Sequence, residues 1–121
     1  MASLLAEILE LSAMAFRAEG IDAKASLRAG PDPVSELVIR GPDGGWTKAL
    51  EIRLAPGENT TTVTVEIVDG VSRMKTRIGT ATIDPEDLAS VALAFARAGT
   101  SRLVRDLRAG RAAAGTPAAS A

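Results

Sequence analysis

The amino-acid sequence predicts an α+β fold in which an N-terminal helix, a five-stranded antiparallel meander and two C-terminal helices form one domain. Apolar residues recur with helical spacing near both ends of the chain. Between residues 21 and 83 the spacing changes to every second residue, and turn sequences interrupt it four times. Short turns join antiparallel neighbours, so we expect an antiparallel sheet. Because such a sheet commonly has one buried face and one solvated face, we expect the helices to cover one face and leave the other in water.

The first predicted element is an amphipathic helix over residues 3–19. Its apolar side chains fall on one side of a helical wheel, with glutamates opposite. Ser3 is the expected N-cap. Gly20 followed by Ile21 is typical of a left-handed C-terminal cap with an apolar residue behind it.

The predicted strands are 21–28, 34–40, 46–55, 60–68 and 71–83. Loop lengths predict their pairing, since a four-residue loop 56–59 places Leu50 opposite Val65 and a four-residue loop 42–45 places Leu37 opposite Leu50. A five-residue loop 29–33 places Ala25 opposite Leu37 in the same way. Asp69-Gly70 between valines favours a two-residue type I′ turn, which would place Glu66 opposite Arg73.

All four turns agree on one division of the side chains between two faces. Gly79 is expected to form a bulge, after which Ala81 and Ile83 turn inward. The side chains expected to face the core are Ile21, Ala23, Ala25, Leu27, Leu37, Ile39, Leu50, Ile52, Leu54, Val63, Val65, Ile67 and Met74.

A strong helix start follows the last strand. Asp84 is the expected N-cap, Pro85 suits the first helical position, and acidic residues suit the first turn. We expect this helix over 85–98, ending at Gly99, and a final helix over about 101–109. The single domain then spans residues 1–111, and the low-complexity segment 112–121 is expected to be a disordered tail.

The composition excludes several kinds of chemistry. The 121 residues include no His, Cys or Tyr, which removes the usual general base, nucleophilic triads and most transition-metal ligands. Glu51 and Glu66 remain as acid/base candidates, and we interpret them as part of a mixed charged surface. Asp84, Glu86 and Asp87 are interpreted as helix-start residues rather than a metal site. The sequence therefore predicts no enzyme activity and no cofactor.

The chain also shows no sign of membrane attachment. No apolar run approaches the roughly 20 residues that a span requires. The N-terminal segment carries Glu7 and Glu10 and lacks the basic start of a signal peptide. Cytoplasmic residence without a membrane partner is the resulting prediction.

The leading functional hypothesis is a small binding or assembly protein that forms a homodimer through the helix 85–98. Within this helix, Leu93 lies opposite the main apolar stripe and beside Ser90 and Arg97. A helix that is apolar nearly all round is buried on more than one side. Either the final helix or a partner protein is expected to cover Leu93.

A second hypothesis is nucleic-acid binding through the outer sheet face or the final helix. Cations on that face include Arg53, Arg73, Lys75 and Arg77, and residues 97–111 carry five arginines. The alternative is that Arg73, Lys75 and Arg77 protect an edge strand against aggregation.

A third hypothesis is a small-molecule carrier with a pocket between helices and sheet. Lys48, Ser72 and Thr76 are polar residues at inward positions, and Trp46 shares their parity. The alternatives are that Lys48 extends to solvent at the sheet edge and Trp46 closes that end of the core.

Overall fold

The computed structural model describes the backbone of residues 2–28, 30–40 and 46–115 and the side chains of 4–28, 30–39 and 47–109. Its elements are α1 (Ala2–Ala18), β1 (Ala23–Arg28), β2 (Val34–Arg40), β3 (Trp46–Pro56), β4 (Thr61–Asp69), β5 (Lys75–Ile83), the 3₁₀ turn η1 (Pro85–Asp87) and α2 (Leu88–Gly115). The predicted α+β class is confirmed. The expected loop 42–45 lies outside the described residues.

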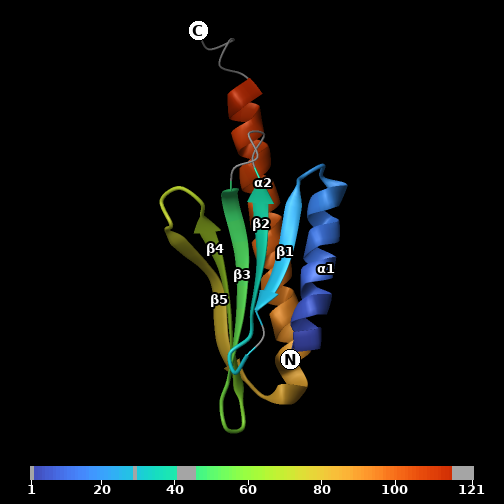
Figure 1. Ribbon diagram of the computed structural model, residues 1–121, viewed down its shortest axis with the longest axis vertical. Helices are drawn as coiled ribbons and strands as arrows, with labels where there is room; N and C mark the ends of the chain where they lie inside the picture. Colours follow the sequence, from blue (N-terminus) through green and yellow to red (C-terminus); the bar gives the residue numbers. More distant parts are fainter. Residues whose placement is uncertain (1, 29, 41–45, 116–121) are drawn as a thin grey trace.

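The sheet is an antiparallel meander in the order β1-β2-β3-β4-β5. Both helices lie on one face, with α1 against β1 and β2 and α2 against β3, β4 and β5 (Figure 1). We call the face without helices the outer face. Apolar residues of the opposite face, from Leu37 on β2 to Val65 on β4, are fully buried beneath the helices. The core therefore lies between one helical layer and one sheet.

The end of α1 has the predicted cap. Gly20 has a φ of 72°, the N–H of Gly20 donates to the Arg17 carbonyl, and the N–H of Ile21 donates to the Phe16 carbonyl. Ile21 is buried behind this cap, as a Schellman motif requires. The start differs slightly, because the helix begins at Ala2 and Ser3 lies inside its first turn.

Two of the predicted strand pairings are confirmed, and one is shifted. Leu37 lies opposite Leu50, and Ala25 lies opposite Leu37. Between β3 and β4, however, Leu50 faces Ile67 instead of Val65, because Pro56 belongs to the strand and pairs with Thr61. The shift of two residues leaves every side chain on its expected face and changes only its partner.

The predicted two-residue turn between β4 and β5 is wrong. Val68 faces Lys75, and Glu66 faces Arg77 instead of Arg73. The carboxylate of Asp69 accepts the N–H groups of Val71 and Ser72, so the chain turns through a longer loop. Arg73, with a φ of 63°, takes the left-handed position.

This longer loop also removes one residue from the expected core. Met74 is 72% exposed at the tip of the hairpin. On β1 only Ala23 is buried, and both Ala25 and Leu27 are exposed although they were expected to face the core. An edge strand is covered by a helix along only part of its length, which explains this difference.

The predicted bulge at Gly79 is confirmed. The β4–β5 register shifts between Val65 and Glu66, and Ala81 and Ile83 then pair with the inward residues Val63 and Thr61. Gly79 has a second role, because a Cβ at this position would lie 2.7 Å from Cδ1 of Phe95. The absence of a side chain lets the Phe95 ring of α2 pack directly on β5.

The prediction of two C-terminal helices is wrong. One helix, α2, continues through Gly99 to Gly115, four residues into the expected tail, and residues 116–121 lie outside the described part. Gly99 is buried where α2 crosses the sheet, and a Cβ there would lie 2.6 Å from Cδ1 of Leu50. This glycine permits close packing and does not end the helix. Asp84 precedes η1 with extended backbone, and its side chain forms no capping hydrogen bond.

Candidate interaction surfaces

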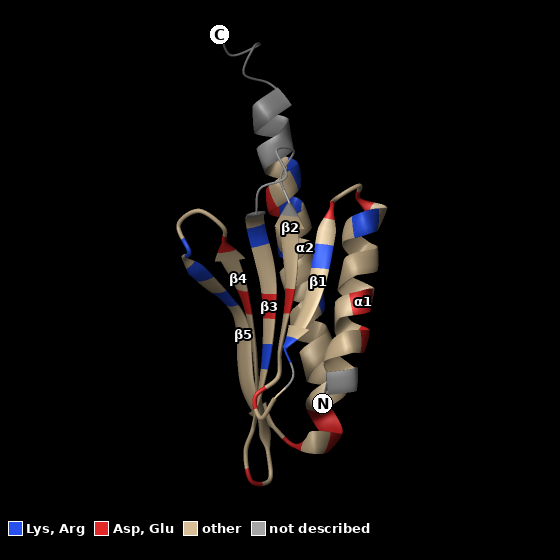
Figure 2. Cartoon of the chain, viewed as in Figure 1, with Lys and Arg blue, Asp and Glu red and all other residues tan. Residues whose placement is uncertain are grey.

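The outer face carries a row of three glutamates. Glu36 on β2 lies opposite Glu51 on β3, which lies opposite Glu66 on β4. Figure 2 shows acidic bands at a similar level on β2, β3 and β4. The shifted β3–β4 register creates the row, because the expected register would place Glu51 opposite Thr64 instead.

Glu51 neutralises two of the four cations that were candidates for a basic face. Its Oε1 lies 3.1 Å from Nη2 of Arg53 and 3.6 Å from Nζ of Lys75, and its side chain is only 12% exposed. A phosphate that bound these cations would first have to displace the carboxylate. Two of the four candidate cations are therefore already paired within the sheet.

The other two candidate cations lie at the edge strand β5 and its loop. Arg73 belongs to the exposed hairpin loop, and Arg77 lies beyond it on the strand. Because β5 is the last strand of the sheet, Arg77 also reaches the side that faces α2.

The residues of the predicted pocket occupy different surroundings. Lys48 lies opposite Asp69, with 4.0 Å between its Nζ and Oδ2 of that carboxylate. Ser72 belongs to the exposed hairpin loop, and Thr76 is exposed on β5 opposite Ile67. The backbone of Trp46 begins β3, and its side chain lies outside the described residues.

Asp69 is the anchor of the hairpin loop. The N–H groups of Ser72 and then Val71 donate to its carboxylate at 2.9 Å, and these hydrogen bonds hold the pKa of Asp69 below its usual value. The side-chain oxygen of Ser72 in turn accepts the N–H of Met74. This side chain thus belongs to the loop's internal hydrogen bonding.

A groove of about 350 Å³ lies along the contact between α1 and α2. We call it the helix groove. Its lining comprises Leu11, Ser12, Ala15, Leu93, Ala96, Arg97, Thr100 and Ser101. Two of the three predicted self-association residues, Leu93 and Arg97, thus lie in one groove. The third, Ser90, is exposed on α2, and its hydroxyl donates to the Asp87 carbonyl.

The helix groove has both exposed apolar and exposed polar side chains. Leu11 is 50% exposed, and Arg97 and Ser101 are also exposed. Thr100 is buried at the floor, and its Oγ1 has no hydrogen-bond partner among the described residues. A buried hydroxyl without a partner costs free energy, so this floor is an incompletely satisfied surface.

A second depression, of about 430 Å³, lies between α2 and the edge strand β5. We call it the arginine hollow. Its lining comprises Arg77, Ile78, Ala98, Ser101, Arg102 and Arg105. Within the described residues, neither Arg77 nor Arg105 forms an ion pair. Nε of Arg102 lies 3.9 Å from Oδ2 of Asp106. Three guanidinium groups from two elements therefore border one open hollow.

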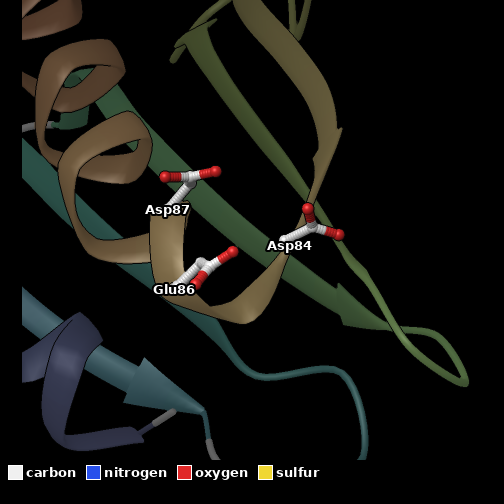
Figure 3. A group of neighbouring side chains, drawn as sticks. All are labelled: Asp84, Glu86 and Asp87. Carbon is white, nitrogen blue, oxygen red and sulfur yellow. The ribbon is translucent and has the colours of Figure 1, made fainter.

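Asp84, Glu86 and Asp87 form a group of exposed carboxylates at the start of α2. Figure 3 shows Asp84 at the end of β5 and the other two on the turn that follows. One oxygen from each lies within 4.8 Å of the others. Their exposure and their position at a helix start agree with the sequence-based interpretation as helix-start residues.

The two depressions were not predicted, because each combines residues from elements whose contact no sequence pattern specified. The arginines at 97, 102 and 105 were the visible signal, although Arg97 was assigned to the predicted helix 85–98 and the other two to a separate final helix. No helix in the described part of the chain has the length and hydropathy needed to cross a membrane. No protein-family model, no curated protein and no solved structure matches this chain.

Proposed function

We propose that this protein is a non-enzymatic assembly module that forms a homodimer through the helix groove. The observation that supports this proposal is the groove itself, in which exposed Leu11 and half-buried Leu93 flank the unsatisfied hydroxyl of Thr100. Exposed apolar side chains beside a buried hydroxyl without a partner form a surface that would gain free energy if a second chain covered it. Because α2 is one continuous helix through Gly115, no separate final helix covers Leu93 within the described residues.

The charges on either side of the groove indicate a second copy of the chain as the occupant. The two helices run in the same direction, since Leu11 lies near Leu93 and Glu19 pairs with Arg108 (Figure 1). Residues 2–16 and 78–96, at the starting end, contain five carboxylates and no cation. The opposite end, residues 17–20 and 97–109, contains five arginines and two carboxylates.

A twofold axis through the centre of the groove would bring unlike ends together. Glu7 lies one helical turn before Leu11, and Arg97 lies one turn after Leu93. Rotation about an axis near the two leucines places Arg97 of one copy near Glu7 of the other. In an isologous interface each such contact occurs two times, so the favourable interaction between Glu7 and Arg97 is doubled.

The first experiment measures the dissociation constant of the dimer by sedimentation equilibrium. Leu11→Glu places a charge in the apolar centre and is expected to weaken the dimer by about tenfold or more. Leu93→Glu should do the same. Leu27→Glu, on exposed β1, is the matched control and should leave the association unchanged. A wild-type chain that stays monomeric at every accessible concentration would contradict the proposal.

A charge-exchange experiment then tests the relative orientation of the two copies. Glu7→Arg and Arg97→Glu should each weaken self-association, because each places like charges together twice. An equimolar mixture of the two variants should form a heterodimer, because both contacts are again between unlike charges. If the mixture associates no better than either variant alone, the twofold arrangement is wrong.

A further inference from the structure

The arginine hollow differs from the helix groove in chemistry and position. The two depressions meet at Ser101 of α2, with Leu93 and Arg97 toward α1 and Arg102 toward β5. Arg105 lies between the two sides, because it also borders a depression beside Glu19 of α1. Arg102 and Arg105 are one helical turn apart, so their side chains project from the same strip of the helix. Arg77 approaches them from the neighbouring strand.

The charge in this hollow is available for an external anion. Arg77 and Arg105 have no ion-pair partner among the described residues, and the pair between Arg102 and Asp106 spans 3.9 Å between exposed side chains. Guanidinium groups bind phosphate oxygens with two parallel hydrogen bonds, which favours arginine over lysine at such sites. The hydroxyl of Ser101 adds a neutral donor at the same border.

We propose that the arginine hollow binds the phosphodiester backbone of duplex nucleic acid without sequence preference. The hollow is open and is bordered by three guanidinium groups, one from β5 and two from α2. Three guanidinium groups spread over two elements match several phosphates along a duplex better than a single small anion. Among the described residues, the lining of the hollow includes no aromatic side chain on which single-stranded bases could stack.

The test is fluorescence anisotropy with a labelled duplex of arbitrary sequence at several salt concentrations. Three phosphate contacts predict a slope of log K against log salt of about −2.7, so affinity should fall about 40-fold between about 50 and 200 mM salt. A variant with Arg77→Gln, Arg102→Gln and Arg105→Gln should lose at least tenfold in affinity at low salt, and its slope should approach zero.

The matched control removes the same number of charges from the outer face, by Lys24→Gln, Arg28→Gln and Arg53→Gln. This variant should bind the duplex as the wild type does, and circular dichroism should show that both triple variants are folded. Absence of duplex binding by the wild type at about 50 mM salt would overturn the proposal. Equal losses in the two triple variants would also overturn it, because they would indicate a general charge effect. Tighter binding to a single strand than to the duplex would also overturn the proposal.

Discussion

The outer sheet face and the helical side of this molecule carry similar residue types in different arrangements. On the sheet, Glu51 lies between Arg53 and Lys75 and pairs with both. On the helical side, carboxylates gather at one end and arginines at the other, and Arg97 and Arg105 form no ion pair within the described residues. The number of cations on a face therefore says less about binding than whether the face already contains their partners.

The two regions also differ in what holds them in place. The helical layer packs closely on the sheet at two glycines. Leu50 of β3 packs against Gly99 of α2, and the Phe95 ring of α2 packs against Gly79 of β5. Side-chain contacts on the outer face are polar, such as the hydroxyl pairs Thr62–Thr82 at 2.8 Å and Thr64–Thr80 at 3.1 Å. Substitutions in the packed contact should thus have larger effects than substitutions among the surface charges.

The largest effect is expected for Gly99→Val. The added side chain would enter the space of Leu50, which is fully buried, and a Cβ alone would already lie 2.6 Å from its Cδ1. Overpacking of this kind should lower the free energy of unfolding by about 2 kcal/mol, measured by urea denaturation. Ala98→Val, at the exposed neighbouring position, is the control and should change stability much less. Equal effects of the two substitutions would mean that packing does not distinguish the helical layer.

An effect confined to the hairpin is expected when Asp69 is protonated. Its folded-state pKa lies below the unfolded value of about 3.9, so its contribution is present at neutral pH and lost as pH falls through the folded-state pKa. The amide resonances of Val71 and Ser72 should titrate together in an NMR experiment, with a midpoint below the usual aspartate value. Asp69→Ala should remove this titration. A midpoint at or above the usual value would contradict the hydrogen-bonded loop.

The smallest effect is expected in the glutamate row. Glu36 faces Glu51 directly and forms no ion pair within the described residues, so Glu36→Gln should raise the free energy of unfolding by about 0.3 kcal/mol. Glu51→Gln should change stability in the opposite direction, by about 0.5 kcal/mol, because Arg53 and Lys75 lose their partner. Urea denaturation of both variants at low salt measures the two changes in free energy of unfolding. If both changes have the same sign, the three glutamates do not act as a charge network.

Much of the fold was predictable because several of its signals are local. Alternating apolar residues assigned most side chains to the correct face even where the register was wrong, since an error of two residues preserves parity. The cap at Gly20 was predictable because it depends on adjacent residues. The β4–β5 loop was not, because an Asp side chain that bonds two loop amides competes with the turn that Asp-Gly alone favours.

The candidate surfaces required information that the sequence pattern does not contain. Gly99 has the same local signature as a helix end, and only its contact with Leu50 shows that it serves packing. Because Gly99 was interpreted as a helix end, Leu93 was assigned to one helix and Arg102 and Arg105 to another. All three residues lie on α2. The glutamate row depended on an exact register, and the two depressions depended on how α2 lies against α1 and β5.

The shared direction of α1 and α2 has an electrical consequence. Two parallel helices add their peptide dipoles, with the positive ends at the starting end of both and the negative ends at the other. Arg17 in the last turn of α1, and Glu86 and Asp87 in the 3₁₀ turn that leads into α2, lie where they compensate these dipoles and stabilise the single chain. Although the formal net charge is only −1, the side-chain charges of the helical layer are separated, with carboxylates toward one end and arginines toward the other. Two such molecules attract when they lie side by side in opposite directions, and added salt should weaken that attraction.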